Sequence, residues 1–260
     1  MKQHSMTEPV GLETLRREIK EICFSSYLYK RCGLRPPHFL ICLDPGAGRT
    51  TFIEYMAGMF RKHGVLCFTG LDDYIEVELD GSLQQLKQAF SRIDAAAVYT
   101  NEFTNIVAMD ISNIASHLNE TQLTDFISGC KRICGSACVV FFVHAVPSRN
   151  EEKLIEKLCS AVENIQRIDA EPYTCKNICD LIVRFIENRG IEIDHPSEFF
   201  SFLQDAVTEH NISDVKSASS YAENLVHYAD FSGFVPVISK DSITSLAADR
   251  GNESRVKEAK

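Results

Sequence analysis

The sequence lacks the features of a nucleic-acid-binding, exported or membrane-spanning protein. Its 36 aspartates and glutamates outnumber its 27 lysines and arginines, which gives a formal net charge of −9. Because non-specific nucleic-acid binding depends on basic side chains that neutralise phosphates, this balance argues against it. The opening MKQHSMTEPV has no apolar core of a signal peptide, and no apolar run is long enough to span a membrane. We therefore expect a cytoplasmic protein that binds neither nucleic acid nor a membrane.

Several enzyme motifs are also absent. The chain has no G-x-S-x-G, no H-E-x-x-H, and no G-x-G-x-x-G followed by an acidic residue. These absences remove support for nucleophile-elbow hydrolases, zinc metalloproteases and Rossmann-type dinucleotide enzymes. Acidic pairs such as Asp72-Asp73 and Glu151-Glu152 are expected to be solvated surface rather than catalytic carboxylates.

The ten cysteines do not indicate a disulfide scaffold, because they lie within apolar runs and no export signal is present. We expect reduced thiols in the core. Two groups leave a metal or redox role open: Cys130, Cys134 and Cys138, and the pair Cys175 and Cys179. Their C-x₃-C spacing favours one face of a helix over the C-x₂-C turn that is typical of structural zinc sites.

Short apolar runs alternate with helical patterns over the first two thirds of the chain. After a leading helix at residues 11–22, whose pattern continues to residue 27, strands are expected at residues 38–43, 65–68, 105–111, 137–145 and 166–170. The helices expected between them cover residues 52–62, 82–92, 120–134 and 151–165. This alternation predicts an α/β fold, a three-layer αβα sandwich with a parallel five-stranded sheet.

Beyond Pro172 the pattern becomes helical. Helices are expected at residues 174–188, 196–210 and 215–229, and residues 231–246 are expected to hold a short strand and a final helical turn. We expect an α/β domain over residues 1–171, a small all-α domain over residues 172–248 and a disordered tail over residues 249–260.

A glycine-rich stretch joins the first expected strand to the next helix. Such a turn lets backbone N–H groups converge on an oxyanion at a helix N-terminus, as the phosphate-binding loop of a P-loop NTPase does. The candidate nucleotide-binding residues here are Asp44, Pro45, Gly46, Ala47, Gly48, Arg49, Thr50 and Thr51. The consensus G-x-x-x-x-G-K-[ST] is broken twice, by Leu43 at the first glycine and by Arg49 at the lysine. The alternative is an ordinary glycine turn.

Five stretches together resemble AAA+ ATPases, and within them the CbxX/CfqX group that includes red-type rubisco activases and stage V sporulation protein K. GLETLRREIKEI is similar to the leading helix of that group, DPGAGRTT to its N-P-G-T-G-K-T, and NIVAMDI to its L-F-I-D-E. EPYTCKNICDLIVRFIENRGIEI and SASSYAENLVHYA are similar to its lid segments. The resemblance covers residues 11–246 and rests on the order and spacing of motifs that are each altered. It implies that the helical domain is a lid.

The resemblance also implies site residues. Thr50 and Asp110 take the positions of the Mg²⁺-side hydroxyl and aspartate, and bound ATP or ADP is the implied cofactor. His144 takes the place of a phosphate sensor; the alternative is an ordinary strand-end histidine. Ile111 stands where these ATPases have the glutamate that polarises water. Because general-base catalysis contributes about 10²–10⁴-fold, hydrolysis by the usual route is not expected.

Other family positions are altered as well. In the lid, Ser220 and Glu223 stand where the family has arginines, and the nearest candidate for an arginine finger is Arg167. A pore aromatic is not evident, since Leu79 precedes the expected segment. These losses all concern coupled hydrolysis and substrate threading, whereas the retained residues support the fold.

Three functional hypotheses follow. The leading one is a degenerate AAA+ module, a pseudo-ATPase that binds nucleotide with weak or no hydrolysis. It would act as a structural or regulatory subunit of a protein-remodelling assembly, in an oligomer of its own or with AAA+ paralogues. The second is a working ATPase that remodels a protein client, with Asp72, Asp73, Glu102 or Asp110 positioning water. The third is a DNA-associated AAA+ protein, against which the acidic balance argues.

Overall fold

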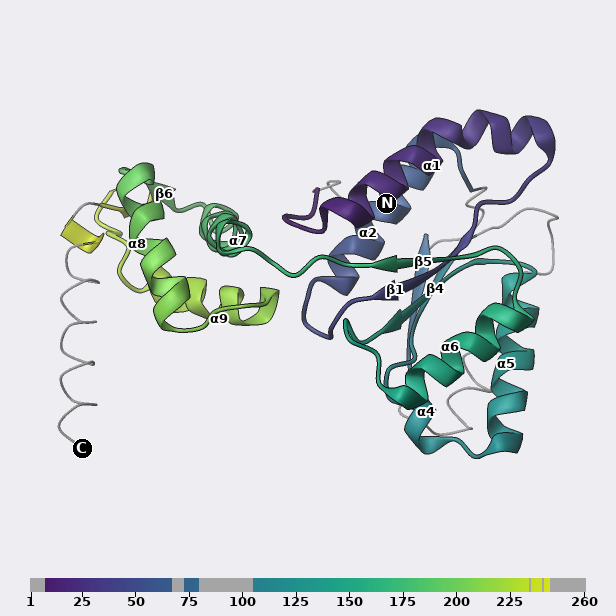
Figure 1. Cartoon of the computed structure of the whole chain (residues 1–260). Coiled ribbons are helices and arrows are strands. Elements are labelled where there is room, and N and C mark those ends of the chain that lie inside the picture. The colour runs from purple at the N-terminus through teal and green to yellow at the C-terminus, as the bar shows by residue number, and fades with distance from the viewer. Residues whose placement is uncertain (1–7, 67–72, 80–104, 234, 240, 244–260) are drawn as a thin grey trace. The chain divides into compact units, whose positions relative to one another are not determined.

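The computed structural model describes residues 8–66, 73–79, 105–233, 235–239 and 241–243. The chain divides into two compact units, Met1–Glu171 and Pro172–Lys260. Each unit is described by itself below (Figure 1).

The first unit is built on a five-stranded sheet with the order β2-β3-β4-β1-β5, in which every neighbouring pair is parallel. The strands are β1 (His38–Cys42), β2 (Tyr74–Glu78), β3 (Ile106–Asp110), β4 (Cys138–Val143) and β5 (Ile165–Asp169). β1 and β4 are buried along their whole length, as expected for central parallel strands with both faces covered. The expected parallel sheet is confirmed.

Helices cover both faces of this sheet (Figure 1). They are α1 (Glu13–Cys32), α2 (Arg49–His63), α4 (Ile114–His117), α5 (Glu120–Cys134) and α6 (Arg149–Ala161). Alternate residues of each strand point to opposite faces. Leu40 and Cys42 therefore pack with Phe126 of α5 and Leu154 of α6, in one hydrophobic core. Figure 1 shows α1 and α2 on the other side of the sheet, which completes the expected three layers.

The edge strand differs from the sequence prediction. Val65 and Leu66 lie outside any strand, and residues 67–68 of the predicted strand lie outside the described residues. The edge of the sheet is instead β2, whose sequence YIEVE alternates apolar and acidic side chains. Only one face of this strand packs on the core, through Val77 and the partly buried Ile75. An alternating pattern suits a half-covered edge strand, which is why the more apolar run before it was a misleading signal.

The second unit is mainly helical. It holds α7 (Cys175–Glu187), α8 (Pro196–Glu209) and α9 (Val215–Val226), which confirms the helical fold expected for this part. Two short strands, β6 (Glu192–Ile193) and β7 (Val237–Ile238), add a parallel pair that sequence analysis anticipated only in part. The Glu192 N–H donates to the Pro236 carbonyl at 2.9 Å, so the chain beyond α9 returns to the exit of α7.

Two expectations concern parts of the chain that the structure does not describe. The helix predicted at residues 82–92 and the tail at residues 249–260 both lie outside the described residues. Within the described residues, every helix is too short or too polar to cross a membrane.

Candidate nucleotide-binding site

The glycine-rich loop follows β1 and leads directly into α2, at the carboxyl end of the sheet where parallel α/β folds bind ligands. Gly46 has a φ of 84° and Gly48 a φ of 83°, so both glycines adopt the left-handed conformation. Any other residue would be strained by about 1–2 kcal/mol there. Gly48 is the N-cap of α2 and supplies no side-chain hydrogen bond to the first turn. The first-turn amides of α2 therefore lack a side-chain cap, as a phosphate cradle requires.

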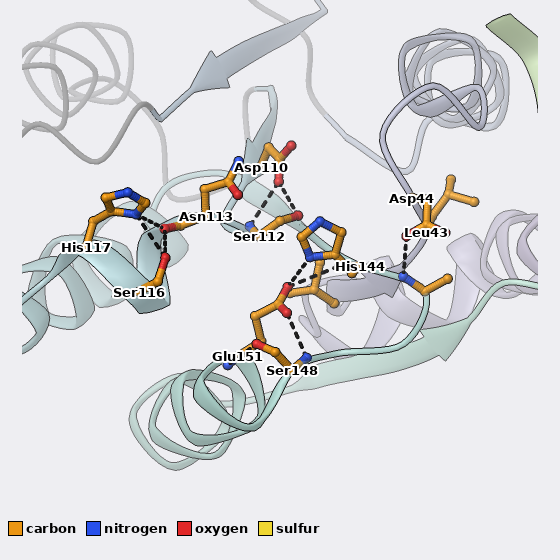
Figure 2. Close-up of polar contacts among 12 residues, drawn as sticks. Leu43, Asp44, Asp110, Ser112, Asn113, Ser116, His117, His144, Ser148 and Glu151 are labelled. Atoms are coloured by element: carbon orange, nitrogen blue, oxygen red, sulfur yellow. Dashed lines mark hydrogen bonds and ion pairs between the residues drawn. The ribbon is translucent and has the colours of Figure 1, made fainter.

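The loop is attached to the end of the neighbouring strand β4. The Leu43 N–H donates to the Val143 carbonyl at 3.0 Å, and the Asp44 carboxylate accepts a hydrogen bond from the Ala145 N–H at 3.0 Å. Figure 2 shows this contact beside the end of β4. The Asp44 side chain thus fixes the glycine-rich loop to the backbone that follows β4.

Arg49 begins α2, and its side chain turns inward across the ends of three strands. Its NH1 group donates to Oδ2 of Asp110 at 2.5 Å, at the end of β3. Its Nε donates to the Leu43 carbonyl at 2.8 Å and its NH2 to the Val143 carbonyl at 3.0 Å. The guanidinium also lies over the Phe142 ring, 5.1 Å from the ring centroid. All three guanidinium nitrogens are therefore engaged by the protein itself.

The environment of Arg49 keeps it charged although its side chain is only 11% exposed. Burial lowers the pKa of the guanidinium, whereas the Asp110 carboxylate, followed by Asp44 and Glu151, raises it. An arginine pKa lies so far above neutral pH that the side chain stays cationic. The site thus contains a positive charge that is paired with the Asp110 carboxylate and lies in the electrostatic field of Asp44 and Glu151.

Both carboxylate oxygens of Asp110 accept hydrogen bonds within the protein. Oδ2 accepts from Arg49. Oδ1 accepts from the Ser112 N–H at 3.0 Å and from the Ser112 hydroxyl at 2.6 Å (Figure 2). The Thr50 hydroxyl donates elsewhere, to the Glu76 carboxylate at 3.4 Å. The two residues expected on the metal side thus have separate partners.

These residues do not fit a magnesium site as they are arranged. Magnesium requires near-octahedral oxygen ligands at about 2.0–2.1 Å and binds carboxylates as a hard cation. The guanidinium of Arg49 lies against the Asp110 oxygen that would serve as such a ligand. Two cations cannot share that oxygen without strong mutual repulsion.

The position after Asp110 belongs to the core. Ile111 is fully buried, and its N–H donates to the Phe142 carbonyl at 2.9 Å. An aliphatic side chain that points into the core has no group to orient a water molecule.

His144 follows β4 and is held by a buried carboxylate. Its Nδ1 lies 2.8 Å from Oε1 of Glu151, and its backbone N–H donates to the same oxygen at 3.3 Å (Figure 2). The second Glu151 oxygen accepts from the Ser148 N–H at 2.8 Å. The His144 side chain is 38% exposed, so the ring is held at Nδ1 and is partly open to solvent.

The buried position of Glu151 corrects a sequence prediction. It was expected on the solvated surface with Glu152, yet Glu151 is only 3% exposed. Burial raises the pKa of this carboxyl, but the hydrogen bonds from Ser148 and His144 outweigh that effect and bring the pKa below its usual value. The local signal was present, because Ser148 and Glu151 form the S-x-x-E capping box at the start of α6. Ser112, the other residue that sequence analysis missed, carried no comparable signal.

Two of the other family positions, Arg167 and Glu223, are engaged in surface ion pairs. Arg167, the nearest candidate for an arginine finger, lies 3.2 Å from the Glu152 carboxylate and 3.1 Å from the Asp169 carboxylate. In the second unit, Glu223 pairs with Arg189 at 2.8 Å. Each of these contacts is satisfied within its own unit.

The three cysteines of the first group are core residues, whereas Cys175 of the pair with Cys179 is exposed, which corrects the expectation that both lie in the core. Cys130, Cys134 and Cys138 are buried, and burial raises the pKa of the Cys134 thiol to about 12. The Cys138 thiol donates to the Pro37 carbonyl at 3.4 Å. Among the described residues, no group of three or more histidines, cysteines or acidic residues is arranged to hold a metal ion.

Comparison with solved structures gives matches at the level of the fold. A single-substitution variant of Thermotoga maritima RuvB, an AAA+ ATPase, is 14% identical and has a TM-score of 0.54, over 91% of this chain and 68% of the RuvB chain. A second RuvB variant from the same organism is 13% identical with a TM-score of 0.52, over 88% of this chain and 67% of its own. The sequence matches no protein-family profile and no curated protein. The chain therefore has a fold similar to that of RuvB.

Proposed function

We propose that this protein is a degenerate AAA+ nucleotide-binding module that binds ATP or ADP at the loop from Asp44 to Thr51 and hydrolyses ATP weakly or not at all. In this proposal it acts as a structural or regulatory subunit of a protein-remodelling assembly. The resemblance to the CbxX/CfqX group, the location in the cytoplasm and the association with AAA+ paralogues are parts of the same proposal. The order of the altered motifs supports them.

The observation that carries the proposal is the direction of the Arg49 side chain. In the ATPases that the chain resembles, a lysine at this position reaches the β- and γ-phosphates. Here the guanidinium donates to Asp110, Leu43 and Val143, inside the protein. The residue that would stabilise charge on the terminal phosphate is thus used to connect three strands.

Nucleotide binding is supported by the parts of the loop that do not depend on this side chain. The left-handed glycines hold the backbone in a turn, and the first turn of α2 has no side-chain cap. A helix N-terminus with such amides attracts an anion through its partial positive charge. His144, held by Glu151, is the proposed contact to a phosphate.

The lack of hydrolysis is supported by Asp110, the last residue of β3, and by Ile111, the first residue after it. Ile111 cannot act as a base, and Asp110 is shared between Arg49 and Ser112. Of the acids that a working ATPase was expected to use instead, Asp73 pairs with Arg61. Asp72 and Glu102 lie outside the described residues.

The experiment that tests the proposal measures binding of a fluorescent ATP analogue to the full chain and then release of phosphate. We expect saturable binding in the micromolar range, which corresponds to about −8 kcal/mol. The substitution Gly48→Glu is expected to abolish binding, because it introduces a carboxylate where the phosphates would lie.

The matched control is Gly64→Glu. Gly64 caps the other end of α2 and is also left-handed, with a φ of 61°. The same substitution there causes similar backbone strain without approaching the loop, so binding should persist. Equal loss in both variants would contradict the proposed site. Phosphate release that disappears in Asp110→Ala would favour the working ATPase instead.

A further inference from the structure

We propose that the guanidinium of Arg49 takes the place that a magnesium ion has in a working site, so that this module binds its nucleotide without a divalent cation. The inference rests on the proposed function, since it concerns the form in which the nucleotide is bound. It follows from the disagreement between the magnesium that the fold implies and the side chains that surround Asp110.

The first step is the position of the positive charge. A magnesium ion in such a site is bound by the aspartate at the end of the strand that corresponds to β3. Here that aspartate is Asp110. The NH1 group of Arg49 lies 2.5 Å from Oδ2 of Asp110. The carboxylate is therefore already neutralised by a cation that belongs to the chain.

The second step is the fixation of that cation. Nε and NH2 of Arg49 donate to the carbonyls of Leu43 and Val143, at the ends of β1 and β4. The planar fork of an arginine suits several acceptors at once, whereas a lysine ammonium is a compact point charge. To admit a magnesium ion, the protein would have to break these contacts, which would take the Arg49 donor from the Leu43 carbonyl and leave the Val143 carbonyl with the Leu43 N–H.

The third step is the remaining metal ligand. The Thr50 hydroxyl, the other ligand implied by the resemblance, donates to Glu76 at 3.4 Å. Asp110 keeps its second oxygen for the N–H and hydroxyl of Ser112. With both ligands engaged, the phosphates of a nucleotide would meet the amides of α2 beside an Asp110 that Arg49 already neutralises, without a metal between them.

The test is a titration of the full chain with fluorescent ATP and ADP analogues, once with excess magnesium and once with EDTA. We expect dissociation constants that agree within about threefold between the two buffers. Binding that is about tenfold or more tighter with magnesium would overturn the inference and leave the proposed function intact. Absence of binding in both buffers would overturn the proposed function itself.

A variant tests whether Arg49 is the reason. Arg49→Lys keeps the charge but removes the fork, which frees Asp110 for a metal, so we expect its affinity to fall about tenfold in EDTA and to recover with magnesium. The matched control is Arg61→Lys, on the same helix and in an ion pair with Asp73, which should behave as the unaltered chain. If Arg49→Lys binds equally in both buffers, Arg49 does not replace the metal. If Arg49→Lys does not fold, the titration of the unaltered chain decides.

Discussion

Two helices that begin beside each other treat their first turns differently. α2 follows β1 and α6 follows β4, and these two strands are neighbours in the sheet. α6 has a capping box in which Ser148 and Glu151 exchange hydrogen bonds with backbone N–H groups. α2 begins at Gly48, which provides no side-chain cap. One helix start is satisfied by its own side chains, and the other leaves its amides for a ligand.

This difference separates the part of the site that maintains structure from the part that is available for binding. The carboxylate of Glu151 belongs to the closed start and also holds His144, which follows β4. Removal of the capping side chains from the closed start should therefore reduce stability, whereas removal of an exposed side chain such as Thr51 from the open start should not.

The largest expected effect breaks the closed start at its buried acid. Glu151→Ala removes the acceptor of the N–H groups of Ser148 and His144, in a position that is 3% exposed. Because hydrogen bonds to a charged group contribute about 1.5–3 kcal/mol each, we expect the free energy of unfolding to fall by about 3 kcal/mol. Urea unfolding followed by circular dichroism measures this change.

The control for that variant is its neighbour. Glu152→Ala removes a carboxylate that pairs with Arg167 on the surface, where about 0–1 kcal/mol is expected. Equal losses for Glu151 and Glu152 would show that the capping box does not stabilise α6 in the way its geometry suggests.

A smaller effect concerns the opposite end of the same two strands, where His38 begins β1. Its Nδ1 accepts a hydrogen bond from the Val139 N–H at 3.2 Å, so the ring is neutral. Burial, with a smaller effect of Arg35, lowers its pKa to about 4 from 6.5. Because the unfolded chain binds the proton more readily, stability is complete above about pH 6.5 and falls as the pH drops toward 4.

The expected loss between about pH 7 and about pH 5 is about 2 kcal/mol from His38 alone. His38→Gln should remove this part of the acid sensitivity, as urea unfolding at the two pH values would show. His117 is the control, because its side chain is exposed and its substitution by glutamine should leave the pH dependence unchanged. An unaltered slope in His38→Gln would contradict the proposed origin.

The smallest effect contrasts the two helix starts directly. Ser148→Ala removes the N-cap hydroxyl of α6 and should cost about 1 kcal/mol. Thr51→Ala, in the exposed first turn of α2, should change stability by less than about 0.5 kcal/mol. The two variants are compared by urea unfolding. A loss of similar size in Thr51→Ala would mean that α2 has a side-chain cap after all.

The central strands were predictable because a parallel strand buried on both faces is a continuous apolar run. The runs HFLIC and CVVFFV show this directly. β2 was not predictable in the same way, since YIEVE resembles a polar segment and, among its residues 74–77, only Val77 is buried. Whether one face of a strand is buried depends on the tertiary structure. A short alternating pattern, which loops also show, does not reveal it.

The glycine turn was also predictable, because its composition already requires unusual backbone angles. The direction of Arg49 was not, since its acceptors Asp110 and Val143 lie 61 and 94 positions away in the sequence. The role of a charged residue in a motif can be assigned only when its partners in the folded chain are known. Glu151 is the intermediate case, where the local capping pattern was readable and its burial was not.

The contacts of Arg49 have a consequence for the entropy of binding. In many phosphate loops the backbone loses conformational freedom when the ligand arrives, and this loss reduces the affinity. Here the guanidinium joins the carbonyls of Leu43 and Val143 as the chain folds, so the freedom of the loop is lost at that stage. A ligand then meets a backbone that is already ordered. Binding therefore costs little conformational entropy of the loop, even for an anion that forms few contacts.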